Sequence, residues 1–518
     1  MGGFGELRIT IQYSDPVLFL TSGVLLFLIY VRSRLRNQLP LPPSPTCLPL
    51  VGNVLQVPRS APWERFREWN LKYGPIVSFK VGSRTIILLG TRTVVRDLFE
   101  KRAHIYSTRP RFIVASEYTL KGLPALLPYD KNWLALHRLE TTVLNPRITT
   151  GTLPIHGMAA KHLLYSILGD PDHDLSDHLH NYAGSVFSTL FYGAHMGSET
   201  PEDQHLMRTI YHEPSKCISI EHWMVEMFPA LEHFPGVASR CRQKGEMLHG
   251  VFHRAFGPKL EAAQNCQWWN MFKHLSKNRP EGLSDRDFLM VITELELAAR
   301  TTGPLSLSLF AVMAALHPNE MRRVHDEIDQ VVGSARLPTF DDQDNLPYLQ
   351  AFMTECQRLY PLVPLSFARA AMRDDSYMGL RIPADAIIVP NQWALNRDPA
   401  IYDDPTSFVP QRWIDSPSLP PPGTFGYGRR ICPGRHIANA SLFIAMASIA
   451  WALDYQKLPG LSAESGLARS MLFCPQTSSV RVSFRSQGHA AVVKREWEAV
   501  NPDMSLTLNE IGDMLGSH

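Results

Sequence analysis

The sequence predicts a mainly helical protein with a small lobe rich in β-strands. Residues 150–285 alternate helical periods with short breaks, and a long apolar helix is expected at about 286–316. Strand-like segments at 76–82 and 85–89 predict a β-hairpin, and two more follow at 380–383 and 386–391. Helical segments therefore cover far more of the chain than strands do.

Composition limits the class of partner. The 518 residues are enough for several domains, and 51 Lys+Arg against 49 Asp+Glu leave no excess of positive charge for nucleic acid. We therefore expect no nucleic-acid partner and favour small, neutral or lipophilic molecules. The seven cysteines are widely spaced and include no C-x-x-C pair, which predicts reduced thiols in a cytosolic setting rather than disulfides or a zinc site. They are Cys47, Cys217, Cys241, Cys266, Cys356, Cys432 and Cys474.

The N-terminal segment, residues 1–36, contains an uncharged apolar run at about 16–31. This run is shorter than the ~20 residues of a usual membrane span, so a cleaved signal peptide is the alternative. The basic residues follow the run and no small-residue cleavage site comes after it, which favours a signal anchor with the rest of the chain cytosolic. Residues 37–53 are rich in proline and predict a stiff hinge next to the membrane, or else an ordinary linker.

A glycine-rich turn at 425–434 carries Cys432 and leads directly into an apolar helix. Backbone N–H groups at a helix N-terminus lower the pKa of a thiol and hold a thiolate, which binds soft metals. Gly428 and Gly434 let the backbone approach a flat ligand, and Arg430 can neutralise a carboxylate beside the metal. An inert buried cysteine is the alternative.

The pattern F-x-x-G-x-R-x-C-x-G in this turn resembles that of the cytochrome P450 family of haem-thiolate monooxygenases. The resemblance matches Cys432 to the proximal iron ligand, with Phe425, Arg430 and Gly434 beside the haem. It implies the cytochrome P450 fold, haem b, a lipophilic substrate, electrons from an NADPH-cytochrome reductase, and a single-pass protein of the endoplasmic reticulum membrane. It covers about 40–484, with 54–484 as the catalytic domain.

Two more segments resemble the parts of the family that bind the haem propionates. Trp133 begins a W-x-x-x-R pattern, but His137 occupies the arginine position and Arg138 follows it, so either side chain could make the contact. Arg369 ends a segment expected to pass the haem edge and is a second candidate. The mostly apolar stretch 112–127 is expected to be an irregular loop that covers the haem and contacts the substrate.

The long helix departs from the family pattern. Aligning His317-Pro318 puts the family's oxygen-side threonine at Thr302 and its usual acidic neighbour at Thr301; a shift by one residue pairs Thr301 with Arg300. The carboxylate is missing in both alignments.

Three more residues of this helix have expected roles. Pro304 removes a backbone donor and should kink the helix. Glu294 and Glu296 are either distant proton sources or surface and salt-bridge residues.

Glu355 and Arg358 lie at i and i+3 of a helix, where they can pair. The resemblance implies that they form, with Arg412, a buried triad that locks the cysteine loop. Gln411 replaces the commoner Glu, without expected harm.

The leading functional hypothesis is a monooxygenase that inserts one oxygen atom of O₂ into a lipophilic molecule. A haem-thiolate isomerase, dehydratase or coupling enzyme is the alternative, supported by the missing acid at Thr301, and a haem-binding protein without turnover is a third class. The cadence of the cysteine loop is similar to that of fungal members that serve secondary metabolism, by analogy alone. Residues 485–518 are an extension without assignment, expected to form a surface helix or a disordered tail.

Overall fold

The computed structural model describes residues 39–171, 173–200, 202–203, 206, 210, 223–462, 472–500 and 503–516. The expected anchor at 16–31 lies outside these residues. The α-helices are α2 (Pro62–Tyr73), α3 (Arg92–Arg96), α4 (Ala103–Tyr106), α5 (Lys131–Thr141), α6 (Pro146–Gly169), α7 (Leu175–Tyr192), α9 (Trp223–Met227), α10 (Val237–Asn265), α11 (Met271–Lys277), α12 (Asp285–Leu316), α13 (Pro318–Val331), α14 (Pro347–Leu359), α15 (Gln392–Leu395), α16 (Gln411–Asp415), α17 (Arg435–Ala452), α18 (Gln487–Glu498) and α19 (Ser505–Met514).

The strands are short and few. They are β1 (Ile76–Val81), β2 (Arg84–Leu89), β3 (Arg369–Ala370), β4 (Asp375–Tyr377), β5 (Leu380–Ile382), β6 (Ile387–Pro390), β7 (Leu453–Lys457) and β8 (Val480–Phe484). Single 3₁₀ or π-helical turns occur at η1 (Val54–Gln56), η2 (Asp97–Lys101), η3 (Ile113–Thr119), η4 (Pro124–Leu126), η6 (Pro229–His233), η7 (Phe340–Asn345) and η8 (Gly428–Arg430). The predicted class, mainly helical with a small β-rich lobe, is confirmed.

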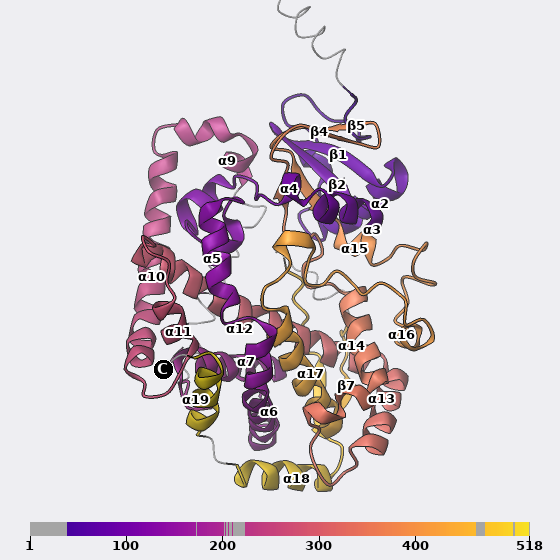
Figure 1. Ribbon diagram of the computed structural model, residues 1–518. Helices are drawn as coiled ribbons and strands as arrows, with labels where there is room; N and C mark the ends of the chain where they lie inside the picture. Colours follow the sequence, from indigo (N-terminus) through magenta and orange to yellow (C-terminus); the bar gives the residue numbers. More distant parts are fainter. Residues whose placement is uncertain are drawn as a thin grey trace, which may run out of the picture.

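The β-rich lobe is a four-stranded sheet in the order β1-β2-β6-β3, at the top of Figure 1 beside α2. The predicted hairpin is β1 paired antiparallel with β2, and the two later strand-like segments are β5 and β6. The described part of the proline-rich hinge lies against this lobe, because Ser78 donates from its backbone N–H to the carbonyl oxygen of Pro43 over 2.9 Å. The described hinge residues, 39–53, are thus attached to the sheet.

Helix α12 runs through the middle of the helical part and packs against α7, α14 and α17 (Figure 1). Ser284 caps its N-terminus by accepting from the backbone N–H of Asp287, and Pro318 begins the next helix immediately after its end. Pro304 lies inside α12, which continues past it. Among the described helices α12 alone is long and apolar enough to cross a membrane, but most of it is buried inside the protein, as in the core helix of a soluble domain.

The segment 112–127, expected to be irregular, is partly helical. Both carboxylate oxygens of Glu226 accept hydrogen bonds from the free N–H groups at the start of η3, those of Ile113 at 2.9 Å and Val114 at 2.7 Å. This acceptor comes from more than a hundred residues away in sequence, so no local pattern indicates it. The segment is held in place by its tertiary partner.

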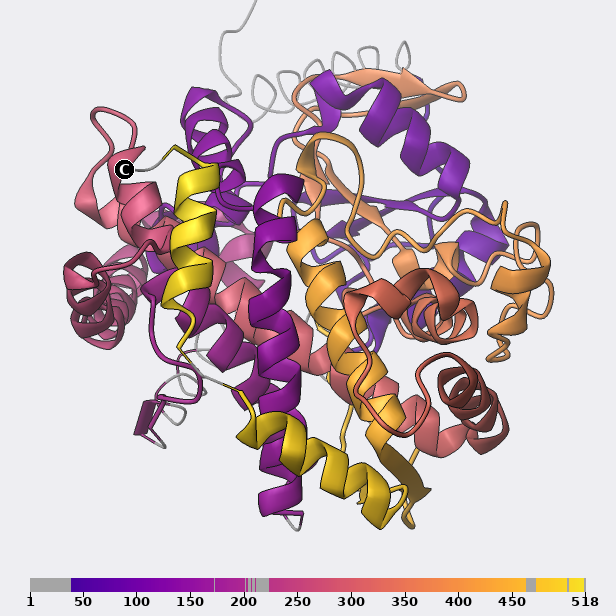
Figure 2. The same cartoon turned by 60° about the horizontal axis from the view of Figure 1, so that its bottom comes forward.

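The C-terminal extension is built into the helical part. Helices α18 and α19 both pack against α6, as Figure 2 shows in yellow and purple. Trp497 of α18 lies over the ring of His162 at 4.8 Å between ring centroids, and Leu508 and Ile511 of α19 are buried. The described part of 485–518 therefore packs apolar side chains against α6 and also forms part of the surface.

Candidate active site

The cysteine loop joins η8 to α17 and has a fixed backbone. The N–H of Cys432 donates to the carbonyl oxygen of Phe425 over 2.8 Å, and the N–H of Ile431 donates to that of Gly428 over 3.1 Å. Gly428 has a φ of +53°, and a side chain there would collide with the carbonyl of Phe99. Only glycine fits at position 428, so the geometry of the loop depends on Gly428.

The thiol of Cys432 is half-buried. Burial raises its pKa, and the opposing effect of the Gly434 backbone N–H is smaller. The expected lowering of the pKa is therefore wrong for the thiol on its own, because loss of solvent outweighs the helix terminus. A thiolate here needs a positive partner such as a metal ion. In the described ranges no three His, Cys, Asp or Glu side chains gather into a metal site.

An open face lies beside the sulfur. A Cβ built on Gly434 would meet only Ile437 at 3.9 Å and the Cys432 Sγ at 4.0 Å. Residues 435–441 of α17 remain partly exposed, whereas the rest of this helix is buried. On α12, Ala298, Ala299 and Thr302 are likewise exposed, although most of this helix is buried. These uncovered faces fit a flat group such as haem.

Three arginines gather without an acidic partner near this face. Arg430 donates to the carbonyl oxygens of Ser107 and Leu127, Arg369 to those of Tyr106 and Tyr427, and Arg109 to those of Ala125, Phe367 and Ala368. Among the described residues none of the three forms an ion pair with a carboxylate.

Burial lowers the pKa of Arg369 to about 8, and repulsion by Arg109 and Arg430 adds to the shift. Burial likewise lowers the pKa of Arg430 to about 9, again with repulsion from Arg109. Such a cluster of mutually repelling cations is stabilised by a dianion, which the two propionates of haem would provide. The residues present therefore fit haem.

The two candidates of the W-x-x-x-R pattern, His137 and Arg138, lie on different sides of helix α5. His137 stacks on Trp133 at 4.7 Å between ring centroids, and the Trp133 ring also lies 3.9 Å from the guanidinium of Arg430. Burial lowers the pKa of His137, with a further contribution from the charge of Arg430. Arg138 is exposed on another side of α5. The structure thus brings His137, but not Arg138, to the arginine cluster.

The two glutamates of α12 have different surroundings. Glu296 is fully buried and pairs with Arg300, whose Nε lies 2.8 Å from its Oε1, and it also accepts from the hydroxyl of Tyr192. It is the salt-bridge residue that the sequence allowed. Glu294 accepts from the backbone N–H of Ala125 at 2.6 Å and lies in the electrostatic range of Glu140 and Arg430.

Thr301 and Thr302 take different positions on α12. The Thr302 hydroxyl donates to the carbonyl oxygen of Ala298 over 2.9 Å on the uncovered face, whereas Thr301 is half-buried. Arg300 is held away by Ser188, over 2.7 Å, and by Glu199. No carboxylate therefore stands at either neighbour of Thr302.

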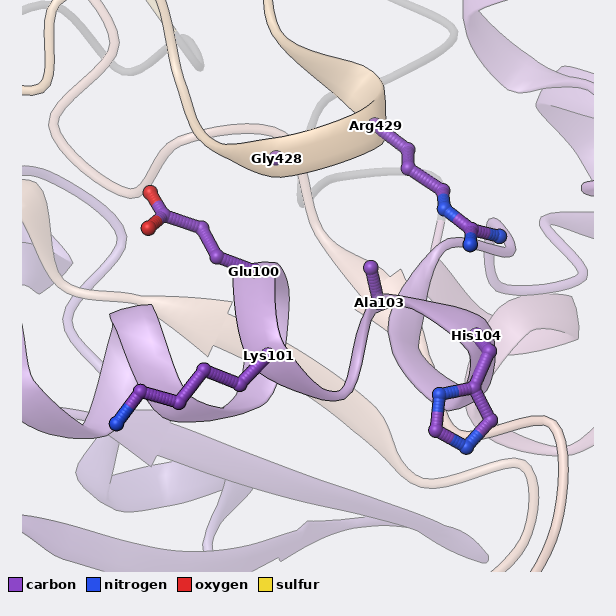
Figure 3. Close-up of a pocket in the computed structure, with 6 residues that line it drawn as sticks. All are labelled: Glu100, Lys101, Ala103, His104, Gly428 and Arg429. Carbon is purple, nitrogen blue, oxygen red and sulfur yellow. The ribbon is translucent and has the colours of Figure 1, made fainter.

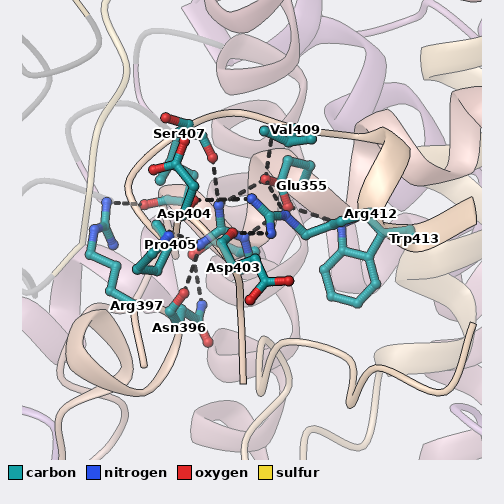
Figure 4. A network of polar contacts seen from close by, with 12 residues as sticks. Glu355, Asn396, Arg397, Asp403, Asp404, Pro405, Ser407, Val409, Arg412 and Trp413 are labelled. Atoms are coloured by element: carbon teal, nitrogen blue, oxygen red, sulfur yellow. Dashed lines mark hydrogen bonds and ion pairs between the residues drawn. The ribbon is translucent and has the colours of Figure 1, made fainter. Parts of the chain in front are cut away.

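Glu355, Arg358 and Arg412 come together in a buried polar network, and Figure 4 shows Glu355 and Arg412 within it. Arg358 makes a two-fold contact with Glu355, each nitrogen to oxygen distance being 2.8 Å, and the Arg412 Nε lies 3.1 Å from Glu355. Trp413 and the backbone of Val409 donate to the same carboxylate. Glu355 therefore accepts from four residues, and Arg412 also donates to the backbone carbonyl oxygens of Asp403 and Asp404.

Further hydrogen bonds connect the network with the cysteine loop. Asn396 donates to the carbonyl oxygen of Arg358 over 2.9 Å, Gln392 donates to Asn396 over 2.6 Å, and Tyr427 in the loop donates to Gln392 over 2.7 Å. The position of the loop is thus tied to that of α14. Gln411, by contrast, points to the surface, where it donates to Asp415.

The outer side of the cysteine loop carries a surface pocket of about 390 Å³. It lies between η2 and η8 and does not include Cys432 (Figure 3). Its lining residues are Glu100, Lys101, Ala103, His104, Gly428 and Arg429. Two neighbouring arginines therefore point to different sides of the cysteine loop: Arg429 lines the surface pocket, and Arg430 contacts the interior.

Sequence reasoning missed two residues of the site. Arg109 follows no motif, and only the tertiary structure brings it to the other arginines. Glu140 could have been found, because Trp133, His137 and Glu140 lie at i, i+4 and i+7 and so share one helix face.

Comparison with known proteins assigns the family. The family model for cytochrome P450 matches residues 42–475. Cytochrome P450 monooxygenase FrzL from Cladobotryum sp is 34% identical over 94% of this chain and 95% of its own. Cytochrome P450 monooxygenase peniB from Penicillium patulum is 34% identical over 85% and 82%, and the echilunin cytochrome P450 monooxygenase from Aspergillus ruber 31% over 98% and 97%.

Proteins of this family bind haem and use a redox partner to oxidise lipophilic molecules. The match covers the arginine cluster, the long helix, the triad and the cysteine loop alike. This chain belongs to the cytochrome P450 family and is a haem-thiolate monooxygenase.

Proposed function

We propose that this protein is an anchored monooxygenase of fungal secondary metabolism. The support is similarity over nearly the full length to fungal monooxygenases. In this proposal residues 16–31 cross the endoplasmic reticulum membrane once, 37–53 form the hinge, 54–484 form the cytosolic catalytic domain, and 485–518 extend it. An NADPH-cytochrome reductase supplies the electrons, and a lipophilic small molecule is the substrate.

The observation that carries the proposed site is the thiol of Cys432 beside three arginines that form no ion pair with a carboxylate in the described part of the chain. We assign Cys432 as iron ligand and Arg430, Arg369 and Arg109 as partners of the propionates. His137 lies beside them, and the Phe425 carbonyl and the side-chain-free Gly434 shape the face next to the sulfur. Haem b bound there supplies the activation of O₂, and thiolate ligation favours cleavage of the O–O bond.

Thr302 is the candidate for handling protons on the open face of α12. Insertion of one oxygen atom into substrate and release of the other as water use two electrons and two protons. A hydroxyl can accept one proton and pass on another, so Thr302 can relay protons without supplying them. Thr301 can add a hydrogen bond but no acid. We assign Glu355, Arg358 and Arg412 a structural role, since their network holds the cysteine loop.

The second candidate is a haem-thiolate isomerase, dehydratase or coupling enzyme. Such chemistry needs no acid for O₂ reduction, and Thr301 and Arg300 leave that position without one. Turnover without NADPH would favour this candidate over the first.

The carbon monoxide complex of the reduced protein tests the iron ligand. We expect the red-shifted Soret band of thiolate-ligated haem in the wild type and its loss in Cys432→Ser. Cys47→Ser is the matched control, because Cys47 is an exposed cysteine far along the chain, and it should keep the band. A Cys432→Ser protein that retains the band would contradict the assignment.

A further inference from the structure

His137, at which this sequence departs from the family pattern, lies in a cluster with acidic side chains. His137 stands at the arginine position of α5, and one turn later on the same face lies Glu140, whose Oε2 is 3.9 Å from the His137 Nδ1. Glu140 is only 2% exposed, and among the described residues its Oε1 has no hydrogen-bond partner. A buried carboxyl without a partner is costly unless it carries a proton or exchanges one.

Glu294 of α12 is a second acid, close enough to Glu140 for the two carboxyls to interact electrostatically. The hydrogen bond from Ala125 fixes its position over 2.6 Å. Burial raises the pKa of Glu294 to about 8, and the negative charge of Glu140 adds to the effect. Burial likewise raises the pKa of Glu140 to about 8. Since an acid with a raised pKa stays protonated up to that pH, the pair holds protons at neutral pH and loses them as the pH rises through about 8.

Four other charged or titratable groups interact electrostatically with the pair. They are Arg109, His137, Arg430 and Cys432. The arginines favour the ionised form, and burial outweighs them. One deprotonated carboxylate of the pair is therefore tolerated between cations, which is what a group that repeatedly gives and regains a proton requires.

A route leads from Glu294 toward Thr302. Glu294, Ala298 and Thr302 follow one another at i, i+4 and i+8, so they form one stripe along α12. Two turns span ~12 Å, so water must connect the carboxyl with the hydroxyl. Ala298 lies between them and carries only a methyl group, so no larger side chain of this stripe separates the carboxyl from the hydroxyl. Glu296 has no such route, because Arg300 and Tyr192 hold it.

We infer that Glu294 and Glu140 form a proton-donating pair, supplied from solvent through His137, that serves the open face at Thr302 in place of the acid missing at Thr301. This inference rests on the proposed monooxygenase function. For each oxygen atom inserted, O₂ takes two electrons from the reductase and two protons from the water chain that Glu294 supplies. One oxygen atom goes to substrate and the other leaves as water. The partly exposed ring of His137 returns protons to Glu140 and thence to Glu294.

Infrared spectra of the resting, haem-loaded protein test the pair without turnover. A protonated carboxyl gives a C=O band separate from that of a carboxylate. We expect such a band in the wild type that disappears as the pH rises through about 8, and in Glu294→Gln we expect the contribution of Glu294 to this band to be missing while that of Glu140 remains. Asp285→Asn is the matched control, because it changes an exposed carboxylate on the same helix, and it should keep the band.

Reduction of O₂ with NADPH and the reductase gives the second readout. Glu294→Gln should reduce the rate of NADPH oxidation at pH 7 by at least about tenfold, since general acids contribute ~10²–10⁴-fold and water replaces part of this. The remaining rate should lose the decline that the wild type shows above about pH 8. Glu140→Gln should shift the decline to lower pH, because a neutral neighbour no longer raises the pKa of Glu294.

Unchanged infrared spectra and an unchanged pH profile in Glu294→Gln would overturn the inference. A wild-type protein that binds haem but oxidises no NADPH would instead contradict the monooxygenase function, and the infrared titration would still decide whether the pair holds a proton.

Discussion

Thr301 is the residue at which we expect this chain to depart most from the chemistry of the family pattern, whereas Thr302 matches the threonine of that pattern. A hydroxyl does not release a proton near neutral pH, so two threonines cannot replace an acid and a threonine. In the proposed proton route, the partly buried carboxyl of Glu294 and the buried carboxyl of Glu140 supply this acid. In the proposed route, the carboxyl of Glu294, about two turns before Thr302 on α12, thus takes the role of the missing acid.

Thr301→Asp tests this relocation when it is combined with Glu294→Gln. An aspartate at 301 would stand next to Thr302 and supply protons directly, so the double variant should recover most of the NADPH oxidation that Glu294→Gln loses. Thr301→Asn, which has the same size without an acid, should give no recovery. Equal rates for both double variants would show that the carboxyl at 301 does not donate protons. Steady-state NADPH oxidation and peroxide release measure the outcome.

Single residues also show how far the sequence could predict the site. Cys432 and Arg430 stand in a dense motif, so their roles beside the haem could be proposed from the amino-acid sequence alone. The choice between His137 and Arg138 required the helix phase, which Trp133 provides. Arg109 could not be predicted, because its neighbours Ala125, Phe367 and Ala368 come from separate parts of the chain.

At the scale of elements, hydrogen bonds connect α14 with the cysteine loop, and Glu355 and Arg358 are the residues of α14 in this network. Their spacing of i and i+3 predicted the pair, and the structure adds Asn396 and Gln392, which carry the connection to Tyr427. The helical turns of segment 112–127 escaped prediction because Glu226, which caps η3, lies far away in sequence.

Arg358→Ala tests this connection. It leaves Glu355 as a buried charge with incomplete pairing, which should reduce the free energy of unfolding by about 3–5 kcal/mol. Haem content per protein should fall as well, because the loop loses its support. Arg65→Ala is the control, since Arg65 and Glu68 form the same i, i+3 pair on the surface, and it should cost no more than ~1 kcal/mol. Full haem content in Arg358→Ala would contradict the structural role. Denaturant unfolding and haem absorbance provide the two measurements.

At the scale of the whole molecule, the sequence predicted a helical body with a small β-rich lobe, and the structure has this architecture. The position of the C-terminal extension could not be predicted, because nothing in the local pattern of α18 or α19 indicates that α6 is their partner. Trp497, Leu508 and Ile511 are apolar residues whose burial only the folded chain reveals. The extension therefore belongs to the same body as the catalytic domain.

Isotope labelling tests the central claim that this body is a monooxygenase. A ligand is first selected from fungal metabolite extracts by the change that it causes in the Soret spectrum. The full chain is then given this ligand, NADPH-cytochrome reductase, NADPH and ¹⁸O₂, and the product is analysed by mass spectrometry. We predict one ¹⁸O atom per product molecule and no product without NADPH. A product that forms without NADPH or carries no ¹⁸O would contradict the monooxygenase function and favour the isomerase or dehydratase alternative.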